Sequence, residues 1–392
     1  MKAYEIKQGI YWVGAKDWNL RDFHGYKTSR GSTYNAYLII DDKITLVDAV
    51  KGYLNDELFS RIASIIDPAK IDYIVCNHVE MDHSGSLPEL MKIAKNAEII
   101  TNNSGKKGLE EHYDASDWKF KVVKTGDEIS LGKRTLSFVT IPMLHWPDSM
   151  MTYLKEDKIL MPNDAFGQHY ASEFLFADEA PYEIVIEEAK KYFANILYPY
   201  SKKLAKLVEG FDLDVDIIAP SHGLMWRGDD ISAILNEYKN WAGGKNKGKA
   251  VVVYDTMWGA TEKMADCVKA TFENEGVEVI KRSLKLNDIS DVITDIVDAK
   301  YVVFGSPCLN SGILPTMGWM LTYLKGLAPT DKIGFCFGSY GWKNGFSKEI
   351  QNAMSDLEWK LPKEPFEAKY RTCNFADLEA VVKDVIAFGK NV

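Results

Sequence analysis

Cysteine is scarce in this sequence and is poorly placed for metal binding or cross-linking. The chain has only 5 cysteines among its 392 residues, and no two of them form a C-x-x-C pair. Such scattered spacing argues against a cysteine metal site and against a disulfide framework. Most of these cysteines lie in or beside apolar runs, so we interpret them as reduced packing residues: Cys76, Cys267, Cys308, Cys336 and Cys373.

The sequence also lacks a long apolar run and an excess of positive charge. No stretch approaches the length of a membrane span, and Met1–Lys7 lacks the apolar core of a signal peptide, so we expect a cytoplasmic protein without a membrane partner. A net charge of −9 argues against nucleic-acid binding, which needs a basic surface. An apolar content of 46% is ordinary for a globular protein, and 392 residues are too many for one core. We therefore predict two domains.

Metal-competent side chains, by contrast, are concentrated in one short segment. His78, Glu80, Asp82 and His83 fall within six residues, and the first three would project to the same side of an extended segment. The preceding run, Ile71–Cys76, predicts a buried strand. A strand that ends in a ligand-rich loop is typical of metal enzymes, and the mixture of imidazole and carboxylate makes a chance cluster a poor explanation.

Three further potential ligands share the same local context downstream. His145, Asp164 and His222 each follow a short apolar run that predicts a strand. Taken alone, each would be interpreted more simply as a core histidine or a turn aspartate. Their common position after a strand favours several strand ends that converge on one metal site.

A Gly/Lys-rich linker at Trp241–Lys249 separates two parts of the sequence, and we predict domains at 1–248 and 249–392. After the linker, apolar strands alternate regularly with helices. This alternation predicts a doubly wound parallel sheet of the flavodoxin order. The five predicted strands are Ala250–Tyr254, Val277–Ser283, Tyr301–Phe304, Ile333–Phe337 and Glu367–Thr372.

Three loops after these strands suit a flat ligand that carries a phosphate. The first loop opens a helix, so its backbone N–H groups can hold a phosphate. The other two combine small residues, an amide side chain and aromatic rings, which suit contact with a flat ring. No Gly-x-Gly-x-x-Gly follows a strand, so we find no site for a nicotinamide dinucleotide. The candidate ligand-binding residues are Thr256, Met257, Trp258, Gly259, Ala260, Thr261, Pro307, Leu309, Asn310, Gly312, Ser339, Tyr340, Gly341 and Trp342.

The metal-ligand series resembles that of the flavodiiron proteins, and the resemblance covers nearly the whole chain. It implies a metallo-β-lactamase-like αββα sandwich followed by a flavodoxin-like domain that binds FMN without a covalent link. By this resemblance, one iron is held by His78, Glu80 and His145, the other by Asp82, His83 and His222, and Asp164 bridges the two.

Two positions bear on the comparison with neighbouring families. Ordinary zinc hydrolases of the metallo-β-lactamase fold carry a second His where this chain has Glu80, and the added anionic oxygen favours iron over zinc. Trp258 stands where many flavodoxins have Thr in the phosphate loop. That change costs one hydroxyl donor but leaves the backbone amides in place.

The resemblance implies an oxidoreductase that reduces dioxygen to water and/or nitric oxide to nitrous oxide. Electrons would pass from an external donor through FMN to a non-haem diiron centre. Some family members append a cysteine-ligated rubredoxin module, which this chain lacks, so we expect a separate donor such as rubredoxin or a reduced deazaflavin coenzyme. We also expect a head-to-tail homodimer or a dimer of dimers. His24, Tyr26 and Tyr198 are candidates to donate hydrogen bonds to the bound gas, although packing or turn roles fit them equally.

Two other classes of function keep the same folds. The first domain would hold zinc and hydrolyse a substrate, with the flavodoxin-like part as a docking module. Alternatively, the chain would be an electron carrier with a vestigial metal site. Glu80 argues against the hydrolase, and the complete ligand series argues against the carrier.

We predict that Glu80→His lowers the iron occupancy of the protein and slows reoxidation of the reduced enzyme, because an imidazole replaces a hard anionic ligand. Elemental analysis after anaerobic purification measures the first effect and stopped-flow spectroscopy the second. Turnover like that of the wild type in this variant would count heavily against a redox metal site.

Overall fold

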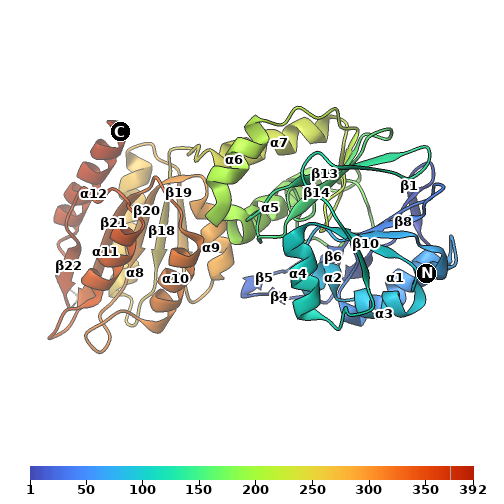
Figure 1. Cartoon of the computed structure of the whole chain (residues 1–392). Coiled ribbons are helices and arrows are strands. Elements are labelled where there is room, and N and C mark those ends of the chain that lie inside the picture. The colour runs from blue at the N-terminus through green and yellow to red at the C-terminus, as the bar shows by residue number, and fades with distance from the viewer. Residues whose placement is uncertain (371) are drawn as a thin grey trace. The chain divides into compact units, whose positions relative to one another are not determined.

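The computed structural model describes residues 1–370 and 372–392, which form two compact units (Figure 1). Unit 1 comprises Met1–His24, Thr28–Tyr192 and Lys202–Lys239. Unit 2 comprises Gly25–Lys27, Phe193–Ser201 and Asn240–Val392. Unit 2 therefore includes three segments that precede the predicted boundary after residue 248, namely 25–27, 193–201 and 240–248. Among the described residues, no helix is both long enough and apolar enough to cross a membrane.

Unit 1 contains two large sheets. The first has the strand order β1-β2-β7-β8-β9-β10-β11, with bounds Tyr4–Lys7, Ile10–Trp12, Tyr37–Ile39, Thr45–Val47, Tyr73–Val75, Glu98–Thr101 and Lys119–Val122. The second has the order β12-β13-β14-β15-β16-β17, with bounds Glu128–Ser130, Thr135–Thr140, Met150–Leu154, Ile159–Met161, Ile217–Ile218 and Trp226–Arg227. The short strands β3 (Ala15–Asp17) and β6 (Ser32–Tyr34) form a separate pair, and β4 spans Asp22–Phe23.

The helices of unit 1 precede or follow these strands. Their bounds are α1 Asn55–Ala63, α2 Met81–Ser84, α3 Leu87–Ile93, α4 Asn103–His112, α5 Tyr182–Tyr192, α6 Ser201–Glu209 and α7 Asp229–Ala242. Short 3₁₀ turns lie at Gly52–Leu54, Pro68–Lys70 and Ala177–Glu179.

Alternating side chains of the first sheet supply two hydrophobic cores, as the two-residue period of a strand requires. Leu38 and Leu46 pack with Leu58 of α1 and Leu90 of α3 on the outer face. Their strand neighbours, including Val47, point the other way and pack against the second sheet. The predicted αββα sandwich is confirmed.

Unit 2 contains a five-stranded sheet in the order β19-β18-β20-β21-β22, and every neighbouring pair is parallel. The bounds are β18 Lys249–Tyr254, β19 Val279–Ser283, β20 Ala299–Gly305, β21 Ile333–Tyr340 and β22 Phe366–Lys369. This is the predicted flavodoxin order. The last strand was predicted at Glu367–Thr372, and position 371 in that range lies outside the described residues.

The helices of unit 2 are α8 Ala260–Asn274, α9 Ile289–Ile296, α10 Pro315–Leu327, α11 Phe346–Asp356 and α12 Phe375–Lys390. This unit also includes β5 (Tyr26–Lys27), a π-helical turn at Phe193–Leu197 and a 3₁₀ turn at Tyr198–Tyr200. Val252 of β18 packs with Phe272 of α8 and Val382 of α12 on one face of the sheet. The alternating residues Val251 and Val253 are fully buried on the opposite face. Helices follow the carboxyl ends of β18, β20 and β21, so three loops gather at one edge of the sheet.

Gly338 in β21 offers a direct test of packing in unit 2. A Cβ atom at this position would lie 1.9 Å from the Ser306 carbonyl oxygen and 2.7 Å from the Phe346 ring. We predict that Gly338→Ala lowers the free energy of unfolding by about 3 kcal/mol because the backbone must shift. Urea unfolding followed by circular dichroism measures the change.

Gly326 is the matched control, since a Cβ there would meet nothing within 4 Å and the residue lies inside α10. Gly326→Ala should raise the free energy of unfolding by about 0.5–1 kcal/mol, because alanine loses less conformational freedom than glycine in a helix. Equal stability of the two variants would contradict the packing described here.

Candidate metal centre and flavin cavity

Four loops of unit 1, each leaving a strand, bring the predicted metal ligands together. His78, Glu80, Asp82 and His83 follow β9, and His145 lies between β13 and β14. Asp164 follows β15, and His222 lies between β16 and β17. The extended geometry expected for the first of these loops ends at Glu80, because the helical turn α2 begins at Met81. This turn separates Asp82 from Glu80 and directs it into a different group of ligands.

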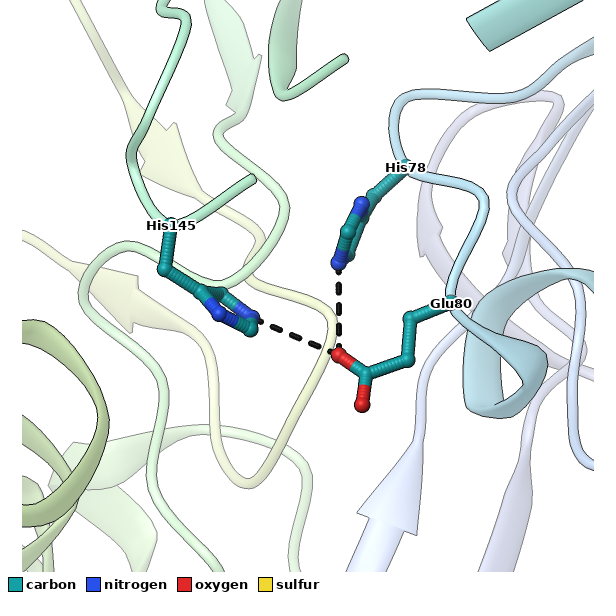
Figure 2. A group of neighbouring side chains, drawn as sticks. All are labelled: His78, Glu80 and His145. Carbon is teal, nitrogen blue, oxygen red and sulfur yellow. Dashed lines mark hydrogen bonds and ion pairs between the residues drawn. The ribbon is translucent and has the colours of Figure 1, made fainter. Parts of the chain in front are cut away.

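The first group consists of His78, Glu80 and His145. Figure 2 shows both imidazoles turned toward the Glu80 carboxylate. The Glu80 Oε2 atom lies 3.3 Å from His78 Nε2 and 3.4 Å from His145 Nε2. Two ligands that are each about 2.1 Å from one ion are separated by distances of this order. The group therefore has the spacing of ligands around a single metal ion.

The second group consists of Asp82, His83 and His222, all of them buried. Asp82 lies 3.4 Å from His83 Nε2 through Oδ1 and 3.2 Å from His222 Nε2 through Oδ2. These separations match those of the first group. The sequence therefore supplies two similar sets of three ligands within one cluster.

Asp164 divides its two carboxylate oxygens between these groups. Oδ2 lies 3.2 Å from His145 Nε2 and 3.9 Å from His78 Nε2. Oδ1 lies 3.2 Å from His83 Nε2 and 3.4 Å from His222 Nε2. A carboxylate placed in this way can bridge two metal ions, which is the role that the family resemblance implies for it.

Local backbone geometry sets the direction of the Asp164 and His222 side chains. Asn163 adopts a left-handed conformation with φ 56°, which its short polar side chain tolerates. Its amide donates to Ser221 Oγ, and the Ser221 N–H donates to the Asn163 carbonyl, so the two loops are tied together. Gly223 has φ 75°, and a Cβ there would lie 1.8 Å from Gln168 Oε1. Only glycine fits directly after His222.

Buried polar atoms in the cluster lack hydrogen-bond partners within the described part of the chain. They include both carboxylate oxygens of Asp82, both ring nitrogens of His83 and Oδ2 of Asp164. Unsatisfied buried groups of this kind are costly unless they bind something. Imidazole and carboxylate ligands suit divalent first-row metals, so the residues fit a pair of such ions.

The electrostatics of the cluster favour a bound cation. Burial lowers the pKa of both His145 and His222, but the facing carboxylates of Asp164, Glu80 and Asp82 reverse this effect and raise the values to about 9 and about 10. Burial also opposes ionisation of Asp164, yet the surrounding imidazoles hold its pKa well below its usual range. The carboxylates therefore attract positive charge into a buried site, whether a proton or a metal ion supplies it.

Further side chains support the ligands from outside the cluster. Asp148 Oδ2 lies 2.9 Å from His78 Nδ1, and the Thr33 carbonyl oxygen lies 2.7 Å from His222 Nδ1. The Tyr192 hydroxyl donates to Asp164 Oδ1 at 3.1 Å. Sequence reasoning gave Asp148, Thr33 and Tyr192 no role. No spacing signal marks them, since each lies at least 28 residues from the ligand that it contacts.

The three candidates for contact with the gas lie in different places. His24 Nε2 lies 2.9 Å from Glu80 Oε1, beside the first ligand group. Tyr26 and Tyr198 belong to unit 2, and the Tyr198 hydroxyl donates to the Val297 carbonyl at 3.5 Å. The structure therefore brings one of the three to the ligands within unit 1. The roles of all three stay predictions.

In unit 2, a cavity of about 440 Å³ lies where the three loops meet at the carboxyl end of the sheet. Its size is that of a small-molecule site. Two of the lining residues carry large rings and are exposed: Trp258 is 81% exposed and Trp342 is 90% exposed. At the first loop, the 15-residue helix α8 begins directly after Gly259, whose φ of 80° lets the chain turn into it. These features suit a flat ring that carries a phosphate.

Eleven of the fourteen residues predicted to bind the ligand line this cavity. The others are Gly259, Thr261 and Gly312. The Thr261 hydroxyl lies 3.2 Å from the Ser339 hydroxyl, and Gly312 exchanges two backbone hydrogen bonds with Leu309. Sequence reasoning missed Cys308, Ser311, Lys343 and Tyr370. Tyr370 had no signal because it follows the edge strand β22 rather than one of the three recognised loops.

Comparison with known proteins matches two family models to successive parts of the chain. Residues 33–223 match the model of the ODP family beta lactamase, and residues 252–381 match the flavodoxin model. The chain is 45% identical to a nitric oxide reductase of Moorella thermoacetica, over 92% of this chain and 91% of that protein. Among solved structures it is similar to the flavodiiron protein from Giardia intestinalis, with 34% identity, a TM-score of 0.95, and coverage of 100% of this chain and 98% of that one. This chain belongs to the flavodiiron protein family.

A second solved structure supports the assignment. The rubredoxin oxygen:oxidoreductase of Desulfovibrio gigas is 39% identical, with a TM-score of 0.97, and the match covers 100% of this chain and 99% of that one. A flavodiiron protein carries a flavin and a pair of non-haem irons, and both candidate sites of this chain fit those groups. The cavity of unit 2 is the candidate FMN site, and the cluster of unit 1 is the candidate diiron site.

Trp342 tests the FMN site. We predict that Trp342→Ala weakens FMN binding about 3- to 10-fold, because stacking on an aromatic ring contributes about 0.5–1.5 kcal/mol. Trp319→Ala is the matched control, since that Trp is 52% exposed on α10 and does not line the cavity. Quenching of FMN fluorescence on titration measures both affinities. An unchanged FMN affinity in Trp342→Ala would show that this ring does not contact FMN.

Proposed function

We propose that this chain is a flavodiiron oxidoreductase that reduces dioxygen to water, nitric oxide to nitrous oxide, or both. The observation that carries the proposal is the Asp164 carboxylate, whose two oxygens face two separate groups of metal ligands. A cavity suited to FMN lies in the same chain. Relatives that match nearly the whole chain are named nitric oxide reductase and rubredoxin oxygen:oxidoreductase, which supports both substrates.

The ligand set suits redox chemistry better than hydrolysis. Glu80, Asp82 and Asp164 place three carboxylates beside four imidazoles, and hard anionic oxygens stabilise the higher charge of an oxidised iron. When bound, the irons and FMN supply the electrons: four for dioxygen, with four protons, to give two waters, or two for a pair of nitric oxide molecules, with two protons, to give nitrous oxide and one water. None of the relatives reported above is named as a hydrolase, so the zinc hydrolase alternative gains no support from them.

The protein residues hold and orient this site. Tyr192 donates a hydrogen bond to the bridging carboxylate of Asp164 and so limits its rotation. His24 lies at the Glu80 oxygen that faces away from His78 and His145, and its side chain is 68% exposed. Burial raises the pKa of Tyr192 well above its ordinary value, and the negative charge of Asp164 adds to this, so the hydroxyl keeps its proton at neutral pH.

We further propose a head-to-tail homodimer, or a dimer of dimers, in the cytoplasm. The family resemblance supports this assembly, in which the FMN of one subunit serves the metal centre of the other. A separate electron donor reduces the FMN, either rubredoxin or a reduced deazaflavin coenzyme. Mixing a variant that lacks metal ligands with a variant that lacks FMN binding tests the assembly, because only exchange between subunits restores activity. A monomer with full activity would contradict it.

Stopped-flow spectroscopy tests the reaction. The FMN of the iron-loaded protein is reduced anaerobically and then mixed with dioxygen or nitric oxide. We predict that at least one of these gases reoxidises the flavin rapidly, and that Asp164→Ala loses this phase because both ligand groups lose their shared carboxylate. Reoxidation at the same rate with and without iron would contradict the proposal, as would a protein that retains two zinc ions after anaerobic purification.

A further inference from the structure

The two ligand groups differ in what lies behind their histidines. All four histidines direct Nε2 into the cluster, and for three of them the surroundings of Nδ1 are defined. His78 Nδ1 lies 2.9 Å from a carboxylate oxygen of Asp148. His222 Nδ1 lies 2.7 Å from the neutral carbonyl of Thr33. Within the described residues, His83 Nδ1 has no hydrogen-bond partner at all. Within the described part of the chain, a carboxylate therefore hydrogen-bonds Nδ1 of a histidine in the first group, and Nδ1 of His83 and of His222 has no such contact. The buried Asp48 carboxylate interacts with His83 through its charge alone.

The Asp148 carboxylate is held firmly in this position. It is 3% exposed, and the oxygen that faces His78 also accepts a hydrogen bond from the Val79 N–H at 2.7 Å. The Asn102 side chain donates to the Asp148 carbonyl at 2.5 Å, while its oxygen caps α4 by accepting from the Gly105 N–H. Asp148 is thus fixed before any metal binds, by one contact to the ligand loop and one to a helix start.

Asp148 also connects two ligands of the same group. It lies three residues after His145, in the loop between β13 and β14. The intervening Trp146 ring packs edge-on against His78, with ring centroids 5.0 Å apart. A single loop therefore supplies one ligand of the first group and two contacts that orient another.

A carboxylate behind a metal-bound histidine fixes its tautomer and makes its other nitrogen a stronger ligand. The effect of a neutral carbonyl is weaker because it carries no full charge. We propose that Asp148 is a positioning residue that makes the two metal positions unequal, with the higher metal affinity at the position of His78, Glu80 and His145. This inference rests on the metal-binding part of the proposed function and not on either gas reaction.

An equilibrium competition tests the proposal on the intact holoenzyme. The FMN-loaded, iron-loaded protein is equilibrated anaerobically with increasing concentrations of a ferrous chelator, and crystals at each stage are measured at the iron absorption edge. We predict that the position of Asp82, His83 and His222 loses iron at a lower chelator concentration than the first position. Equilibrium is needed because the deeper burial of the second group slows release and would mislead a rate measurement. Equal loss from both positions, or earlier loss from the first, overturns the proposal.

Two variants isolate the charge of Asp148 from its shape. Asp148→Asn keeps one oxygen that can accept from both His78 Nδ1 and the Val79 N–H, and loses only the negative charge. We predict a 10- to 100-fold loss of iron affinity at the first position, with the second position nearly unchanged. Asp148→Ala removes the acceptor as well and should cost more. Equal weakening of both positions by Asp148→Asn would show a general structural role and overturn the proposal.

Ser149→Ala is the matched control in the same loop. The Ser149 hydroxyl accepts a hydrogen bond from the Trp146 N–H at 3.1 Å and contacts no ligand. This variant should leave the affinities of the two positions in their wild-type ratio. If Asp148→Asn fails to fold, the order of iron loss from the wild-type protein decides the question alone. A protein that binds no iron at either position would refute the proposed function itself, whereas two equal positions refute only this inference.

Discussion

The contact on which unit 1 depends most is that of the Asp164 carboxylate with four imidazoles. Asp164 is 1% exposed, and each of its oxygens faces histidines of a different ligand group. A buried carboxylate is tolerated only when opposite charge or hydrogen bonds compensate it. Here the negative charge is neutralised either by protonated imidazoles or by metal ions, so the folded chain favours the binding of cations at this site. Redox chemistry becomes possible when the bound cations are iron ions rather than protons.

The fold brings the ligands together by placing them in short loops at the ends of strands. In unit 1 the ligands leave β9, β13, β15 and β16, and both sheets contribute. In unit 2 the candidate FMN cavity is built in the same way, from loops that follow β18, β20 and β21. Strands that are buried on both faces hold such loops closely, while the loops remain free to carry polar residues. Both candidate cofactor sites are thus formed by loops at the ends of strands.

The sequence was informative where function depends on local spacing. The ligands near His78 are adjacent in sequence, and the FMN loops follow regular apolar strands, so both could be recognised. Asp148 and Tyr192 were missed because their partners, His78 and Asp164, lie far away in the sequence and only the tertiary fold joins them. The direction of Asp82 was also unpredictable, since it depends on a single helical turn that begins at Met81. Long-range pairing and local turn geometry leave no periodic signal.

Crystallography at the iron absorption edge, combined with elemental analysis, tests the central claim most directly. The protein would be purified and crystallised anaerobically with FMN bound. The account predicts two iron atoms per chain, one on each side of the Asp164 carboxylate, with His78, Glu80 and His145 around one of them and Asp82, His83 and His222 around the other. A single metal ion, or two zinc ions in these positions, would contradict it.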